Sequence, residues 1–160
     1  MKYVQPNNMY MRRTIDSLLS KLLITIMAAM TLNVLWQVFS RYFMATPSSF
    51  TDELARYLMI WIGILGAAYV AGKNGHVAID VIPSRLSPTR QKRLRQGVRL
   101  CIVLFSFFAM VLGGIRLVYI TYILQQYSPA LEVPLALVYA VIPFSGLLII
   151  YYKITDMVQD

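Results

Sequence analysis

Four long hydrophobic stretches, separated by short polar segments, occupy most of this chain of 160 residues. The stretches run over residues 22–43, 54–72, 98–122 and 133–152. Each is close to the roughly 20 residues that an α-helix needs to cross a hydrocarbon core about 30 Å thick. The pattern predicts an all-α integral membrane protein of four spanning helices, forming a single membrane domain over residues 1–160.

Local signals predict where two of the helices begin. Ser49 precedes Asp52 and Glu53, the order of a helix N-cap followed by acidic residues that face the positive end of the helix dipole. The pair Ser87-Pro88 predicts a second start, because proline is favoured at the first position of a helix. Between them, residues 76–83 are mildly apolar and too short to cross, so we expect an interfacial segment there.

Lys and Arg residues lie on alternate sides of the hydrophobic stretches. They precede the first stretch and crowd the segment 73–97, whereas segments 45–51 and 125–132 contain none. Under the positive-inside rule, both termini and the basic loop 73–97 are expected in the cytoplasm and the two short turns outside. Topology and contact with anionic membrane lipids then explain the net charge of +8, and no nucleic-acid partner is expected.

Residues that carry enzyme or metal chemistry are sparse. The chain has one cysteine, Cys101, and one histidine, His76, which excludes an internal disulfide and paired-histidine haem ligation. The sequence has no phosphate loop and no nucleophile with a matching base. We therefore expect neither an enzyme nor a bound cofactor or metal.

A polar stripe runs along the first span. Asn33, Gln37 and then Ser40 or Arg41 recur at helical spacing, so we expect this face to contact protein. The favoured interpretation is hydrogen bonding between helices, which fixes their packing. A solute pathway is the alternative.

A charged cluster is predicted at the outer end of the second span. Glu53, Arg56 and Tyr57 lie one helical turn apart, within reach of Arg41 across a short turn. We expect these charges to form a network partly shielded from water. In the third span, Arg116 lies about 25 Å along the helix from Arg99, and we expect it to need a carboxylate. The candidate carboxylates are Asp52, Glu53 and Glu132. Such an ion pair would hold the bundle together or form a subunit contact, and a voltage-sensing or substrate-binding arginine is the less favoured alternative.

Small and aromatic residues predict how the helices pack. The face Gly63-Ala67-Ala71 of the second span and the pair Gly113-Gly114 in the third predict close helix contacts. We place the two tryptophans at a protein interface, and the tyrosines near the span ends in aromatic belts. These aromatic residues are Trp36, Trp61, Tyr42, Tyr57, Tyr151 and Tyr152.

The first half of the chain carries a specific combination of short motifs. They are Arg41-Tyr42-Phe43, the run 50–58, Trp61, Gly66-Ala67-Ala68 and the run 75–80. This combination closely resembles the small membrane subunit, called the Q or DctQ-like subunit, of tripartite ATP-independent periplasmic (TRAP) transporters. The second half matches in hydropathy and length only. Two mild departures are Phe50, where the family often has Trp, and Asp52, where it often has Glu.

The resemblance implies several partners. A large multi-spanning transport subunit would be obligate, and an extracytoplasmic binding protein would deliver an organic acid for sodium-driven uptake across the bacterial inner membrane. The sodium and substrate sites would then belong to the large subunit. The chain stops at Asp160, soon after the fourth span, so we expect the large subunit to be a separate polypeptide. The resemblance does not select one substrate among dicarboxylates, sialic acids and other carboxylated solutes.

The motifs and the polar residues of the spans together give the candidates for structural or partner contact. They are Asn33, Gln37, Arg41, Asp52, Glu53, Arg56, Trp61, Gly66, His76, Asp80 and Arg116. Two other functions stay open as alternatives. One is a self-associating multidrug-type exporter. Proteins of that type resemble a design in which an acidic residue lies deep in the first span, whereas the nearest acidic residue here, Asp16, lies in the flank of that span. A membrane anchor or assembly subunit with no part in transport is the other.

Overall fold

The structure is a computed structural model that describes residues 6–43, 49–73 and 88–159, and these residues are almost entirely helical. Four helical stretches, Tyr10–Phe43, Ser49–Gly72, Arg93–Ile123 and Leu135–Met157, are long and apolar enough to cross a membrane. The predicted all-α fold with four spans is confirmed. The elements are α1 (Pro6–Phe43), α2 (Ser49–Gly72), α3 (Pro88–Phe105), η3 (Ser106–Leu112), α4 (Gly113–Ile123), α5 (Leu135–Tyr139) and α6 (Val141–Gln159).

Several helix boundaries agree with the local signals in the sequence. Helix α2 begins at Ser49 with Asp52 in its first turn, and α3 begins at Pro88, both as predicted. Helix α1 begins much earlier than residue 22, because Leu19 continues its apolar face and is buried in the core. Helix α6 runs past residue 152 for a similar reason, since residues beyond that point are buried. The predicted interfacial segment 76–83 lies outside the described residues.

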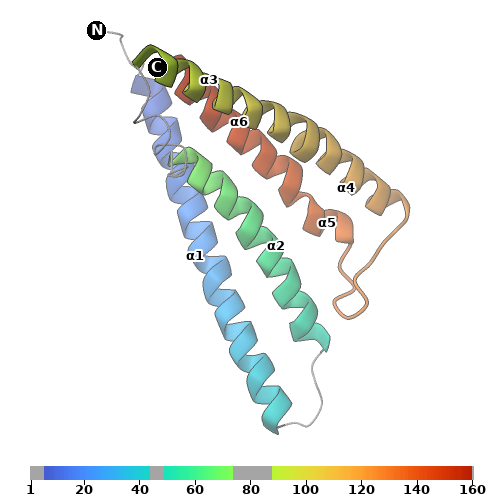
Figure 1. Ribbon diagram of the computed structural model, residues 1–160. Coiled ribbons are helices and arrows are strands. Elements are labelled where there is room, and N and C mark those ends of the chain that lie inside the picture. The colour runs from blue at the N-terminus through green and yellow to red at the C-terminus, as the bar shows by residue number, and fades with distance from the viewer. Residues whose placement is uncertain (1–5, 44–48, 74–87, 160) are drawn as a thin grey trace.

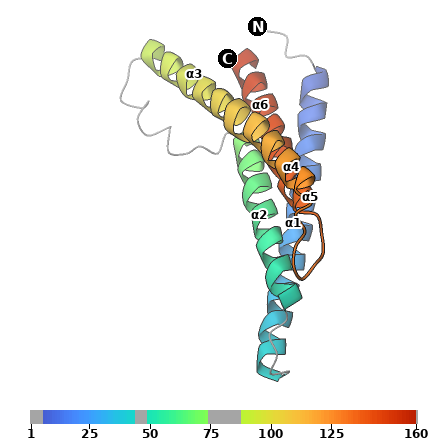
Figure 2. The same ribbon diagram turned by 90° about the vertical axis from the view of Figure 1, so that its right-hand side faces the viewer.

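The spanning helices lie in a row rather than in a closed bundle (Figure 1). Helix α1 packs on α2, α2 packs on α6, and α6 packs on α3 and η3. The start of α1 and the end of α6 lie at one end of the molecule, here called the terminal end. The end of α1, the start of α2 and the α4–α5 connection lie toward the opposite end, here called the turn end (Figures 1 and 2).

The third and fourth spans depart from regular α-helix where they cross. The third span is π-helical over η3. In the fourth, α5 and α6 are separated at Ala140, and Pro143 contributes to this break because it has no N–H to donate to the preceding turn. The crossing is tight: a Cβ on Gly114 would lie 2.8 Å from Pro143 Cδ, and one on Gly146 would lie 2.8 Å from Met110 Cβ. The close packing predicted at Gly114 is confirmed.

The core of the molecule selects a different face of α2 from the one that the small residues predict. Leu65, Ala68 and Ala71 are buried there. Gly63 and Ala67 are exposed, and a Cβ added to Gly63 would meet nothing within 4 Å. The prediction of close packing was therefore wrong for these two residues. Helix α2 is apolar nearly all round, so its hydropathy does not determine its rotation about its axis.

Candidate functional site

Charged side chains from three spans meet at the terminal end. Arg12 of α1 donates a hydrogen bond from Nη1 to Oδ1 of Asp156 in α6 at 2.8 Å, and the side chain of Asp156 is only 4% exposed. Arg99 of α3 donates from Nη1 to the backbone carbonyl of Asp156 at 3.1 Å. One residue of α6 is thereby tied to both α1 and α3. We call the charged and polar side chains that meet here the terminal cluster. Its members are Arg12, Asp16, Arg99, Tyr152, Lys153 and Asp156.

The terminal cluster also satisfies the end of α2. The last carbonyls of a helix have no partner within it and carry the negative end of its dipole. Lys153 donates from Nζ to the carbonyl of Ala71 at 3.0 Å, and Arg12 donates from Nη2 to the carbonyl of Gly72. Lys153 also lies 3.8 Å from Oδ2 of Asp156. Two cations from α1 and α6 therefore cap α2.

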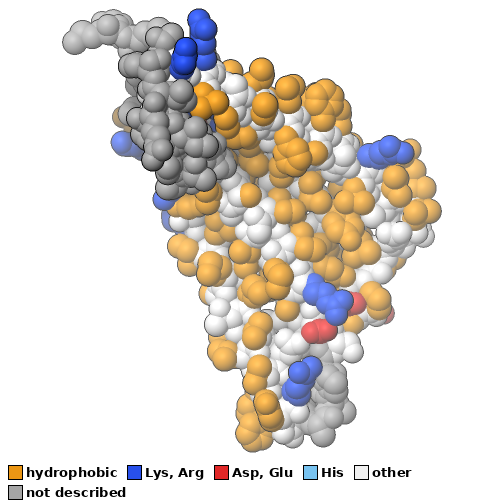
Figure 3. Space-filling model, in the orientation of Figure 1, with side chains coloured by type: hydrophobic (Ala, Val, Ile, Leu, Met, Phe, Trp, Pro, Cys, Tyr) orange, Lys and Arg blue, Asp and Glu red, His pale blue; other side chains and the backbone are white. Residues whose placement is uncertain are grey.

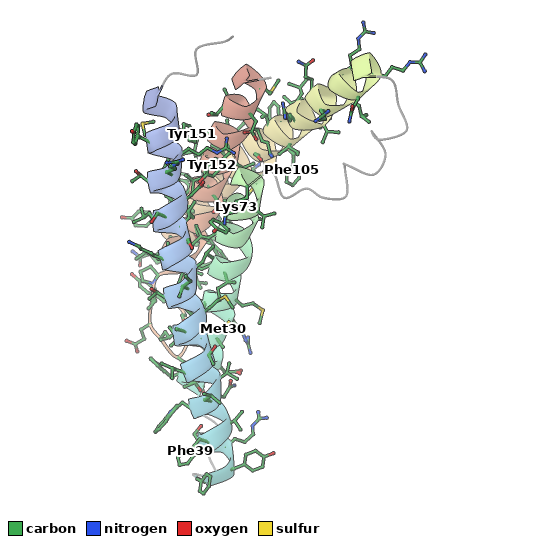
Figure 4. All side chains as sticks on the ribbon, turned by 90° about the vertical axis from the view of Figure 1, so that its left-hand side faces the viewer. Met30, Phe39, Lys73, Phe105, Tyr151 and Tyr152 are labelled. Atoms are coloured by element: carbon green, nitrogen blue, oxygen red, sulfur yellow. The ribbon has the colours of Figure 1, made fainter. Side chains whose placement is uncertain are left out.

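Tyr152 belongs to the terminal cluster rather than to an aromatic belt. Its side chain is fully buried, and its hydroxyl donates to Oδ1 of Asp16 in α1 at 2.5 Å. The Arg12 guanidinium lies 5.6 Å from its ring centroid, within cation–π range. Figure 4 shows Tyr151 and Tyr152 near the terminal end, far from Phe39. The belt assignment of Tyr152 was wrong because hydropathy cannot distinguish a tyrosine at the membrane surface from one inserted between helices.

Lys73 directly follows α2 and faces Tyr69. Its Nζ lies 4.5 Å from the Tyr69 ring centroid. A hydrogen bond to Tyr69, together with the charge interaction between the two side chains, raises the pKa of Lys73 above its ordinary value. The residue therefore keeps its positive charge at the end of the helix, where a cation is favourable.

Sequence reasoning missed the terminal cluster. Four of its charged residues, Arg12, Asp16, Lys153 and Asp156, lie outside the four predicted hydrophobic stretches. One signal was available, since Lys153 and Asp156 are three residues apart on the continuation of an apolar helix. Their partners, however, come from distant parts of the chain, since Arg12 and Asp156 are 144 positions apart. Such pairings depend on which helices are neighbours.

At the turn end, Glu53 holds the connection between α4 and α5. Its Oε2 accepts a hydrogen bond from the Ser128 hydroxyl and further bonds from the backbone N–H groups of Ala130 and Leu131, at 3.1 and 3.2 Å. The connection also bonds to itself, for example from Ser128 N to Val133 O at 3.0 Å. Glu53 thus attaches the third and fourth spans to the start of α2.

The predicted charged network around Glu53 is corrected in two respects. Arg56 pairs with Asp52 at 3.1 Å rather than with Glu53, and this pair is exposed, with side chains 73% and 53% accessible. Arg41 is exposed and forms no ion pair with any residue that the structure describes. Gln37 already lies opposite Asp52, so Arg41, one turn further along α1, extends past the first turn of α2.

The polar stripe of α1 makes the predicted contacts between helices. Asn33 is buried and donates from Nδ2 to the carbonyl of Thr51 at 2.8 Å. Gln37 donates from Nε2 to Oδ1 of Asp52 at 2.7 Å. In α2, Trp61 donates from Nε1 to the carbonyl of Val138 at 3.1 Å, so it lies at a contact between helices of this chain. The interpretation of the stripe as hydrogen bonding between α1 and α2 is confirmed.

The remaining candidates lie elsewhere. A Cβ on Gly66 would meet nothing within 4 Å, so no close contact within this chain requires a glycine there. Arg116 is exposed, and no ion pair joins it to Asp52, Glu53, Glu132 or any other carboxylate among the described residues. The predicted pairing of Arg116 inside the chain was therefore wrong. His76 and Asp80 lie outside the described residues.

Hydrophobic side chains are spread over the face of the spans that Figure 3 shows, and many large hydrophobic residues of all four spans are exposed. The most apolar window of each of the first three spans is 17% buried, whereas that of the fourth is 39% buried. The fourth span is thus the most buried of the four, and the other three offer wide apolar faces to their surroundings. In a membrane, such faces meet lipid or another membrane protein.

Known proteins share this sequence pattern. Residues 30–160 match the family described as tripartite ATP-independent periplasmic transporters, DctQ component. A Haemophilus influenzae protein designated a TRAP transporter small permease is 28% identical, over 91% of this chain and 88% of that protein. The ectoine TRAP transporter small permease protein TeaB of Halomonas elongata is 30% identical, over 84% of this chain and 72% of TeaB. The C4-dicarboxylate TRAP transporter small permease protein DctQ of Rhodobacter capsulatus is 35% identical, over 62% and 44%.

Proposed function

Because this chain belongs to the DctQ component family of tripartite ATP-independent periplasmic transporters, we propose that it is the scaffold for a separate large transport subunit in sodium-driven uptake of a carboxylated solute. It is a multi-pass protein of the bacterial inner membrane. Its relatives are permease subunits of transporters and not enzymes. The scaffold role, the sodium coupling and the class of solute are the parts that we propose.

One observation supports the scaffold role above the others. Two polar side chains of the first span that were candidates for a pathway are engaged within the chain, since Asn33 and Gln37 both bond to α2. Trp61 of α2 likewise bonds to α5. The outward faces are apolar instead. This arrangement suits a rigid body that binds another membrane protein, since lining an aqueous pathway requires free polar groups.

The names of the relatives guide the choice of substrate class. TeaB is named for ectoine and DctQ of Rhodobacter capsulatus for C4-dicarboxylates, so small permeases of this family serve transporters of different solutes. We infer that residues outside this chain select the solute. A periplasmic binding protein would deliver it, and the large subunit would hold the substrate and sodium sites.

The exporter alternative has little support. A proton-coupled exporter needs an acid that can exchange protons deep in the membrane. In α1, Asp16 lies in the terminal cluster and accepts a hydrogen bond from the Tyr152 hydroxyl, so it stabilises the contact between α1 and α6. Family membership also favours the transporter subunit.

Reconstitution tests the proposal. The chain would be co-expressed with the large subunit and the binding protein of the same transporter, and uptake of labelled dicarboxylate and sialic acid would be measured in vesicles under an inward sodium gradient. We expect uptake with all three proteins, and loss of uptake when this chain or the gradient is omitted. Full uptake by the large subunit and binding protein alone would contradict a required scaffold.

A further inference from the structure

Arg116 points away from the other helices of this chain. Helix α4 packs against its neighbours through Gly114 and Thr121, which are both buried. Arg116 follows Gly114 by two positions, so it lies about 200° around the helix, nearly opposite the packed side. Its side chain is exposed, and no change of rotamer could carry it through the helix to a carboxylate on the packed side.

The surroundings of Arg116 are apolar. Leu112, Tyr119, Ile120 and Ile123 are all exposed, and their spacing from Arg116 places them on the same outward side of the span. These five residues form what we call the α4 outer face. One arginine therefore sits within a hydrophobic stripe.

The depth of Arg116 makes this arrangement costly in lipid alone. Arg99 marks the terminal end, where it bonds to the carbonyl of Asp156, and Arg116 lies about 25 Å further along the same span. Helix α4 continues for about 10 Å beyond Arg116 before it ends at Ile123. Side chains on a helix lean toward its N-terminus, which directs Arg116 away from the turn end and into the apolar layer. Charged groups in that layer need a partner.

The carboxylates that the structure describes have other positions or other partners. Asp16 and Asp156 lie in the terminal cluster, at the opposite end of the span. Asp52 binds Gln37 and Arg56, while Glu53 binds the α4–α5 connection. Glu132 lies in that connection, beyond the end of α4, with a φ of 54°. No carboxylate in the described part of the chain therefore serves as the anion that Arg116 requires.

We propose that the α4 outer face is the contact for a membrane helix of the large subunit, and that this helix brings a carboxylate to Arg116. The inference rests on the proposed function, since it assigns a place on this chain to the partner. Charge complementarity selects the occupant: a helix can hold a carboxylate at the depth of Arg116, whereas a lipid phosphate stays at the membrane surface. The apolar residues around Arg116 would exclude water and strengthen the pair.

Co-purification of a tagged chain with the large subunit tests the contact. Arg116→Leu and Arg116→Glu should lower recovery of the large subunit by about tenfold or more, whereas Arg116→Lys, which keeps the charge, should retain most of it. Arg93→Leu is the matched control, because Arg93 is an exposed cation of the same span near the terminal end. It should leave recovery unchanged. The isolated Arg116→Leu chain should unfold in detergent at the wild-type temperature.

A photo-reactive side chain in place of Tyr119 gives a second readout. We expect a covalent product with the large subunit after illumination. Wild-type recovery by Arg116→Leu, a product with lipid only, or a lower unfolding temperature of the isolated Arg116→Leu chain would each overturn the inference, the last by showing a role within the chain. Failure of the wild-type chain to recover any large subunit would instead count against the proposed function.

Discussion

Tyr152 of α6 lies directly against Gly72, the last residue of α2. A Cβ added to Gly72 would stand 2.8 Å from Cζ of the Tyr152 ring and 2.9 Å from both Cε atoms. Real Cβ atoms do not approach a ring so closely, and this ring is fully buried, so it has no free space into which to move. The contact sets how closely the second and fourth spans approach.

The first prediction concerns this contact. Gly72→Ala should destabilise the isolated chain by about 1–3 kcal/mol, the usual cost of overpacking a core. The measurement is thermal or denaturant unfolding in detergent micelles, followed by circular dichroism. Gly63→Ala is the matched control on the same helix, because its Cβ would meet nothing within 4 Å. It should be neutral or slightly stabilising, and equal losses in both variants would refute the contact.

The second prediction contrasts two ion pairs. Asp156→Asn should destabilise the chain by about 3–5 kcal/mol, because it leaves Arg12 and the buried Lys153 without their carboxylate. Arg56→Gln should change stability by no more than about 1 kcal/mol, because its pair with Asp52 is exposed. Unfolding of both variants in the same detergent would measure the difference. A larger loss in Arg56→Gln would show that the turn end, and not the terminal cluster, holds the fold.

The third prediction concerns Glu53. Glu53→Ala removes the acceptor of three hydrogen bonds from the α4–α5 connection, and hydrogen bonds to a charged acceptor are stronger than those between neutral groups. Hydrogen exchange at the amides of Ala130 and Leu131 should therefore become faster. Glu132→Gln is the control, since Glu132 is exposed in the same connection. Unchanged exchange in Glu53→Ala would mean that the connection holds its shape unaided.

The fourth prediction concerns Asn33. Asn33→Ala removes the bond to the Thr51 carbonyl and should weaken the α1–α2 contact by about 0.6–2 kcal/mol. Any loss of transport in the reconstituted system should match the loss of assembly, and the ratio of dicarboxylate to sialic acid uptake should stay that of the wild type. Thr31→Ala is the control, because its hydroxyl bonds only within α1. A changed solute preference would place Asn33 on the transport pathway.

The fifth prediction tests which side of the membrane each end faces. In a Cys101→Ser background, Gln126→Cys at the turn end should react with a membrane-impermeant thiol reagent from the periplasm. Gln96→Cys, near the terminal end, should react only after permeabilisation; both positions are exposed. Ser128 would be a poor reporter, because it is 1% exposed. Labelling in the reverse pattern would invert the topology that the basic residues predict.

Much of the turn end could be predicted from local sequence. Ser49 and Asp52 mark the start of α2, and the spacing of Asn33 and Gln37 places both on the face that meets α2. These features depend on neighbours one or two turns away, or across one short hairpin. The partner of Glu53 could not be predicted in this way, because Ser128 lies 75 residues further along the chain.

The sequence by itself determined the number, length and approximate ends of the spans, and its motifs identified the family. Hydrophobic length is enough for these, because the thickness of the membrane sets it. Only the tertiary structure decided the rotation of each helix about its axis. Gly63 faces outward, Tyr152 is buried in the core, and the Arg116 side chain points away from the other helices. Helices that are apolar on all sides carry little rotational signal, so packing between neighbours fixes their orientation.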